Sequence, residues 1–215
     1  MRKEQFEEGE FYHIYNRGVD RRTTFGNDSD RIRFLHSLYV LNNFAGIPFR
    51  FNIFKLEPRE LLTPQEPYVE IVAGCLMPNH FHLMLRPKKK DGISKFMHKV
   101  GSSYTLYFNR LNERSGCLFE GPFKAKHVDR HEYASYLTQY IHLNPIDLWR
   151  TKLSTKEDLW KKVAEYQWSS LPVYLGENNI FSLVVNEDFR NTTLGIDAAT
   201  YHEFCQDSLE DLCRA

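Results

Sequence analysis

The sequence predicts an α+β fold, with an antiparallel sheet covered by helices on one face. Aromatic and β-branched stretches of strand character alternate with helical patterns, and two of these strands are separated by only a tight turn. No internal repeat is visible. The 215 residues, 42% of them hydrophobic, can bury a core without disulfides or a structural metal. The expected order is strand, helix, strand, strand pair, helix, strand, helix.

The first half of the chain carries most of the expected strands. Asp28 or Asp30 is expected to cap a helix with apolar residues at helical spacing. Met77-Pro78-Asn79 forms the tight turn of a hairpin. The predicted strands are 11–17, 49–56, 69–76 and 80–86.

The second half is mostly helical. An apolar stripe at i, i+3, i+4 spacing predicts a helix over about 93–113, and a short strand follows within 117–128. Asp129 and Glu132 have capping-box spacing and are expected to open the next helix. Asn144 precedes a proline, which disfavours the α conformation, so this helix is expected to end there. Residues 146–215 indicate short helices and turns.

The net charge is zero, but its distribution is uneven. Residues 86–130 carry 11 Lys/Arg against 4 Asp/Glu, and residues 151–215 carry 6 against 11. A basic segment inside a neutral chain is a candidate phosphate-facing surface. On charge alone, a solvated helix face and loop explains it better.

Several protein classes are excluded or disfavoured by simple patterns. The longest apolar run is far below the ~18 residues of a membrane helix. The first ten residues are charged, so we expect no secretory signal. The four cysteines form no CxxC pair and are expected to be reduced thiols. We therefore expect a cytoplasmic protein that does not contact membranes.

A His-x-His pair stands on the predicted return strand. Strand side chains alternate, so His80 and His82 share one sheet face while Phe81 points into the core. Two imidazoles at this spacing can supply two nitrogen ligands to one metal ion. A pair of exposed histidines on a half-solvated sheet is an equally good explanation of so short a pattern.

A second candidate group lies on the predicted helix before Pro145. Tyr140 and Asn144 are i, i+4 on one helix face. The Asn144 amide oxygen could be a third metal ligand, and Tyr140 a covalent nucleophile. A core tyrosine is the alternative, Tyr133 and Tyr136 are rival nucleophiles on the same face, and His142 points away from Tyr140.

Two nitrogens and one oxygen leave open positions for a phosphate oxygen and water. A hard ion such as Mg²⁺ or Mn²⁺ suits a phosphate substrate, and it would act as a Lewis acid on a phosphodiester. Structural zinc is disfavoured, because no cysteine pair could close the site.

With these residues in place, the chain resembles the HUH (His-hydrophobic-His) single-tyrosine transposases, and specifically their REP-associated branch. The ordered set of motifs carries the resemblance and covers most of residues 11–176. The motifs are YHIYNRGVDRR at 12–22, CLMPNHFHLML at 75–85, SSYTLYFNRLNERSGCLFEGPFKAK at 102–126, YLTQYIHLNPI at 136–146 and YQWSSLPVYLG at 166–176.

The resemblance implies a ferredoxin-like antiparallel sheet with helices packed on it, plus a C-terminal helical extension. It implies His80, His82 and Asn144 as metal ligands and Tyr140 as the nucleophile. The substrate would be single-stranded or hairpin DNA at repetitive palindromic (REP) elements. Cleavage would leave a 5′-phosphotyrosine and a free 3′-OH, and strand transfer would reverse it. We expect residues 1–150 to form this domain and 151–215 the extension.

The resemblance also gives the basic residues a role in contacting DNA phosphates. Tyr12 and Phe123 are candidates for stacking on bases. Gly121-Pro122-Phe123 stands where relatives often have Gly-Arg-aromatic, which removes one expected basic contact. The candidate DNA-contacting residues are Arg17, Arg21, Arg22, Arg86, Lys88, Lys89, Lys90, Lys95, Lys99, Lys124 and Lys126.

Three other activities stay open. The chain could be a domesticated protein that binds DNA hairpins without strand transfer, a replication-initiation or relaxase-type HUH nuclease, or a hydrolase that uses water. The sequence decides neither monomer against homodimer nor a tyrosine in cis against one from a partner.

Overall fold

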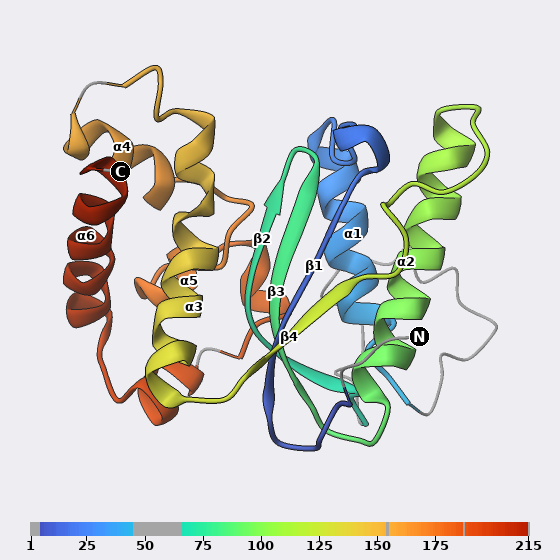
Figure 1. The fold of residues 1–215 in the computed structure, drawn as a ribbon, viewed down its shortest axis with the longest axis horizontal. Helices are drawn as coiled ribbons and strands as arrows, with labels where there is room; N and C mark the ends of the chain where they lie inside the picture. The colour runs from blue at the N-terminus through green and yellow to red at the C-terminus, as the bar shows by residue number, and fades with distance from the viewer. Residues whose placement is uncertain (1–4, 45–65, 154, 187, 215) are drawn as a thin grey trace.

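The computed structural model describes residues 5–44, 66–153, 155–186 and 188–214. A four-stranded antiparallel sheet of order β2-β3-β1-β4 lies at its centre (Figure 1). The strands are β1 (Phe11–Arg17), β2 (Val69–Met77), β3 (His80–Pro87) and β4 (Lys124–Val128). The helices are α1 (Asp28–Val40), α2 (Gly92–Leu111), α3 (His131–Leu143), α4 (Lys156–Ala164), α5 (Leu171–Tyr174) and α6 (Ala198–Arg214).

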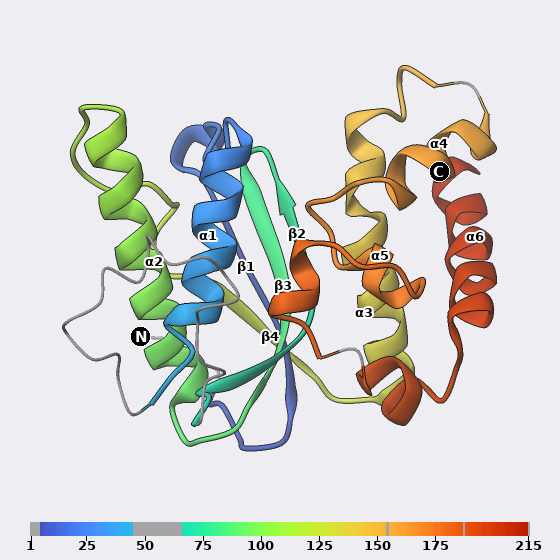
Figure 2. The ribbon, with the colours of Figure 1, turned by 180° about the vertical axis from the view of Figure 1, so that it is seen from behind.

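The chain order β1-α1-β2-β3-α2-β4 and the sheet order give a ferredoxin-like fold, as predicted. The expectation of helices on one face is wrong. Helices α1 and α2 cover one face, while α3 and the C-terminal helices lie over the other (Figures 1 and 2). Every residue of β2 is buried, as a strand covered on both sides requires.

The predicted strands at 11–17, 69–76, 80–86 and within 117–128 are confirmed, with small shifts in their ends. The predicted strand 49–56 lies outside the described residues. The chain after residue 146 was expected to form only short helices, but it ends in the 17-residue helix α6.

Helix α1 begins with a capping box one residue before the expected cap. The side chain of Asn27 accepts a hydrogen bond from the backbone N–H of Asp30 (2.9 Å), and the Asp30 carboxylate accepts one from the N–H of Asn27 (3.3 Å). Asp28 is the first helical residue, and Asp30 is the third. The expected cap at Asp28 or Asp30 is therefore wrong, because Asn27 already satisfies the first turn.

Both ends of α3 differ from the expectation. The chain stays extended at Arg130 (φ −139°, ψ 148°) after β4, so α3 begins at His131 with no capping side chain on Arg130. Asn144 keeps helical angles (φ −51°, ψ −35°), and the chain runs on into a 3₁₀ turn, Asn144–Leu148. Pro145 fits early in that turn, where no backbone N–H is required. Because Asn144 stays helical, it remains below Tyr140 on one helix face.

Residues after 150 pack on the same sheet as the N-terminal part. The backbone N–H of Leu76 donates to the Trp168 carbonyl (2.8 Å), and the Tyr174 hydroxyl donates to the Val72 carbonyl (2.9 Å). A Cβ placed on Gly74 would lie 2.7 Å from the Phe181 ring, so a glycine allows this close approach. The division into two units at residue 150 stays a prediction.

Two further findings concern membrane spans and cysteines. No helix in the described ranges is long and apolar enough to cross a membrane. Cys75, Cys117 and Cys205 are free thiols, and the first and last are buried.

Candidate active site

The sheet register brings β1 beside the His-x-His pair. Tyr15 pairs with His82 and Arg17 with His80, so these four side chains share one face of the sheet. Helix α3 lies over this face, and Phe81 points to the other face, where its ring meets those of Phe34 and Phe119. The predicted alternation of the three residues is confirmed.

The hydrogen bonds around His80 favour the tautomer with its hydrogen on Nδ1. The Asn79 amide N–H donates to the Arg21 carbonyl (3.1 Å), so the Asn79 Oδ1 faces His80 Nδ1 at 2.6 Å and must accept from it. Burial lowers the pKa of His80, and a hydrogen bond with Asn144 opposes this. In the neutral ring with its hydrogen on Nδ1, the Nε2 carries a lone pair. That lone pair lies 3.1 Å from Asn144 Oδ1.

Two lone pairs that face each other at this distance repel unless a cation lies between them. Adjacent ligands of an octahedral Mg²⁺ with bonds of about 2.1 Å are about 3.0 Å apart. The spacing of His80 Nε2 and Asn144 Oδ1 therefore fits two ligands of one hard cation. The described residues contain no cluster of three His, Cys, Asp or Glu side chains that could hold a metal, so a site here needs the Asn144 oxygen.

His13 is a residue of this site that the sequence reasoning missed. Its Nε2 lies 2.8 Å from His82 Nδ1, and the two rings are stacked. Burial lowers the pKa of His13 to about 4 and that of His82 to about 2, so both rings are neutral. If His82 Nδ1–H donates to His13, the Nε2 of His82 keeps its lone pair for a metal. The alternation of β1 places His13 on this face, but only the strand register shows that it meets His82.

Tyr140 is the tyrosine of α3 that lies at the histidines. Its ring centroid is 5.4 Å from that of His82 and 6.0 Å from that of His13, and 40% of its surface is exposed. Burial raises the pKa of Tyr140, and a hydrogen bond with Asn144 opposes the rise. The rivals Tyr136 and Tyr133, one and two turns away from Tyr140, stack on each other.

His142 belongs to the packing of α3, as its helix position suggested. It is fully buried, and its ring nitrogens lie 2.6 Å from the Tyr201 hydroxyl and 2.7 Å from the Ser170 hydroxyl. Burial lowers its pKa to about 3. The neutral His142 ring joins α3 to α6 and to the segment before α5.

The predicted DNA-contacting residues fall into two groups. Arg17, Lys124 and Lys126 lie on the face of the histidines, because Tyr15 pairs with Lys124 and His13 with Lys126 on β4. Arg21 and Arg22 lie in or just after the 3₁₀ turn after β1, where the Arg21 carbonyl contacts Asn79.

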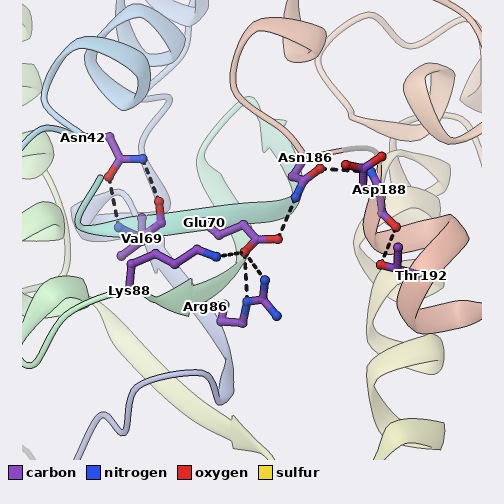
Figure 3. A network of polar contacts seen from close by, with 8 residues as sticks. All are labelled: Asn42, Val69, Glu70, Arg86, Lys88, Asn186, Asp188 and Thr192. Carbon is purple, nitrogen blue, oxygen red and sulfur yellow. Dashed lines mark hydrogen bonds and ion pairs between the residues drawn. The ribbon is translucent and has the colours of Figure 1, made fainter. Parts of the chain in front are cut away.

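The second group lies at the other end of β3 and at the start of α2. Arg86 and Lys88 both pair with the buried carboxylate of Glu70, which also accepts from Asn186 (Figure 3). Arg86 is six residues beyond His80, about 20 Å along an extended strand. The remaining members are Lys89, which pairs with Glu66, Lys99, which donates to the Tyr68 hydroxyl, and the exposed Lys90 and Lys95.

Tyr12 and Phe123, the two residues expected to stack on bases, differ in their exposure. Tyr12 is 1% exposed and packs edge-on against Phe6, so its ring cannot receive a base and that expectation is wrong. Phe123 is half-buried and lines a groove of about 800 Å³ between α2 and the loop before β4. Phe81 also lines this groove, so the groove lies on the sheet face opposite the histidines.

Comparisons with known proteins bear directly on this geometry. Residues 63–144 match the family model of IS200-like transposases. The resemblance to the HUH single-tyrosine transposases is confirmed. The matched segment contains His80, His82, Tyr140 and Asn144, the four residues that the fold brings together.

One solved structure shares the fold of this chain. It is a REP-associated tyrosine transposase bound to a REP hairpin, with a TM-score of 0.54 and 13% identity. The match covers 84% of this chain and 88% of that one. No curated protein sequence matches this chain.

Proposed function

We propose that the protein is a metal-dependent endonuclease and strand transferase that acts on single-stranded DNA at palindromic hairpins. The observation that carries the proposal is the 3.1 Å approach of His80 Nε2 to Asn144 Oδ1, beside His82 and Tyr140. In the neutral ring with its hydrogen on Nδ1, this approach brings a pair of lone pairs face to face. Such a pair is costly in a purely structural role and suitable for a cation. The IS200-like match and the hairpin bound to the structural relative support DNA as the substrate.

His80, His82 and Asn144 would hold the ion, with Mg²⁺ or Mn²⁺ as the best fit to a nitrogen–oxygen ligand set and a phosphate substrate. When bound, the ion would polarise the phosphodiester and stabilise negative charge on the phenolate and the leaving oxygen. Its charge would also oppose the effect of burial on the pKa of Tyr140.

Tyr140 would attack the phosphorus in line with the leaving group. The new bond joins its hydroxyl oxygen to phosphorus, the bond from phosphorus to the 3′ oxygen breaks, and the proton lost by Tyr140 is balanced by the one that the 3′ oxygen gains. The phosphotyrosine conserves the energy of the broken bond, so a 3′-OH can reverse the step. Because Tyr140 lies beside the histidines of its own chain, we propose that it acts in cis.

The test uses a labelled single strand that carries the palindromic repeat flanking the gene, with Mg²⁺ or Mn²⁺. A denaturing protein gel should show a labelled covalent adduct that is lost with chelator and in Tyr140→Phe, by at least about a thousandfold. The matched control is Tyr136→Phe, which removes a hydroxyl from the same helix and should keep the adduct. Cleavage without an adduct would show that water is the nucleophile. Binding with neither adduct nor cleavage, across a panel of hairpins and both metals, would leave a binding protein only.

A further inference from the structure

Helix α3 carries a row of tyrosines that leads away from the proposed site. Tyr133, Tyr136 and Tyr140, which we call the tyrosine strip, are i, i+3 and i+7 on one helix face. The rings of Tyr133 and Tyr136 are stacked, with centroids 6.3 Å apart and planes 22° apart. Tyr136 is 59% exposed and Tyr140 40%, whereas most large apolar side chains of the described residues are buried. Burial in the core does not explain why an aromatic residue stands at position 136.

A row of cations runs beside the tyrosine strip on the neighbouring strand. Lys124 and Lys126 of β4 are exposed and alternate with Ala125, so both point to the α3 face of the sheet. The Lys126 ammonium lies 4.6 Å from the centre of the Tyr133 ring. Lys124 lies 3.6 Å from the Glu120 carboxylate and 6.0 Å from the Tyr15 ring. Lys126 is thus the cation that aligns with the strip.

We propose that the tyrosine strip and Lys126 form a track for the single-stranded DNA that flanks the scissile phosphate, with a base stacked on Tyr136 and a backbone phosphate on Lys126. Exposed rings beside cations are the usual means of binding single strands with little dependence on sequence. The proposal rests on the proposed function, because Tyr140 marks where the track meets the chemistry.

The dimensions suit this ligand. Seven residues of helix separate Tyr133 from Tyr140, a rise of about 10 Å. At the ~3.4 Å spacing of stacked nucleotides, the strip accommodates about three of them. A paired stem keeps its bases inside the duplex, so a stem could use Lys126 but not the ring of Tyr136. The preference for unpaired over paired DNA is therefore the property that this surface predicts.

The first experiment measures binding of a fluorescent oligo-dT strand and of a blunt hairpin by anisotropy. Tyr136→Ala should weaken binding of the single strand by at least about fivefold and leave the blunt hairpin unchanged. Tyr136→Phe keeps the ring and should restore binding of the single strand. Leu111→Ala, at an equally exposed position on α2, is the matched control and should change neither.

The second variant tests the cation. Lys126→Gln should reduce the steepness of the salt dependence for the single strand by about 0.7 in the log–log plot, as expected for one lost phosphate contact. An unchanged affinity of Tyr136→Ala for the single strand, or an equal loss for the blunt hairpin, would overturn the track.

Failure of the track can be distinguished from failure of the proposed function. An adduct that forms in the wild type while Tyr136→Ala binds normally removes the track alone. Absence of an adduct, with the predicted loss in Tyr136→Ala, removes the strand-transfer activity and leaves the track.

Discussion

The two ends of strand β3 both gather polar side chains on the α3 face, and they differ in how those side chains are satisfied. At the far end, Arg86, Lys88 and Asn186 surround the Glu70 carboxylate, so each charge has an opposite charge or a hydrogen bond (Figure 3). At the near end, His80 Nε2 and Asn144 Oδ1 lie 3.1 Å apart, and they present two lone pairs to each other when the hydrogen of the neutral ring is on Nδ1. The far end is complete as a structural network, whereas under the proposed function a cation would complete the near end.

The comparison makes separate predictions for stability and for metal binding. Changes at the Glu70 end should alter the free energy of unfolding and leave metal binding alone. Changes at the His80 end should weaken metal binding and leave the free energy of unfolding without metal nearly unchanged.

The largest effect is expected at the third ligand. Asn144→Leu removes the amide oxygen, keeps the size of the side chain, and should weaken Mn²⁺ binding by more than about a hundredfold, measured by calorimetry. Because the substitution also removes the facing lone pairs, the melting temperature without metal should stay the same or rise. A large loss of stability with intact metal binding would show that Asn144 is a structural residue.

The next effect concerns Glu70. Glu70→Ala leaves Arg86 and Lys88 without their carboxylate and should lower the free energy of unfolding by about 2–3 kcal/mol, below the usual figure for a buried pair because both cations are partly exposed. Urea denaturation measures this. Mn²⁺ affinity should be unchanged, and a parallel loss of it would show that the two ends are coupled.

A smaller effect is expected at His13. His13→Ala removes the ring whose Nε2 contacts His82 Nδ1 and, under the proposed function, should weaken Mn²⁺ binding by about 10- to 100-fold. His13→Gln offers an oxygen to His82 Nδ1–H and should recover part of the affinity. If Ala and Gln behave alike, the contact does not orient His82.

The smallest effect is a dependence on pH at the Glu70 end. Burial by itself raises the pKa of Glu70, but hydrogen bonds from Lys88 and Arg86 and the charge of Arg86 outweigh burial and lower it below 4.5. The carboxylate therefore stabilises the fold fully above pH 4.5, and this contribution is lost as the pH falls through the lowered pKa. The difference in unfolding free energy between wild type and Glu70→Gln should shrink below pH 4.5 in urea titrations at several pH values. A constant difference would show that the charge of Glu70 contributes nothing.

Much of this arrangement could be predicted from local sequence. Alternation placed His80 and His82 on one face, helical spacing placed Tyr140 above Asn144, and the hairpin turn at Pro78 placed β2 beside β3. The end of α3 could not be predicted correctly, because Pro145 is accommodated by a 3₁₀ turn that continues the helix. The cap of α1 was missed by one residue, since Asn27 and Asp30 satisfy each other across the first turn.

The sequence by itself determined the strands, the main helices and which residues share a face, because these properties depend on neighbours within a few positions. Only the tertiary structure decided that His13 meets His82, since strand register joins residues 69 positions apart. It also decided which lysines and arginines lie near Tyr140 and which pair with Glu70, because like charges close in sequence can lie at opposite ends of a sheet. Helices on both faces were likewise decided by the fold, since the position of α3 depends on contacts with α6 and with the segment before α5.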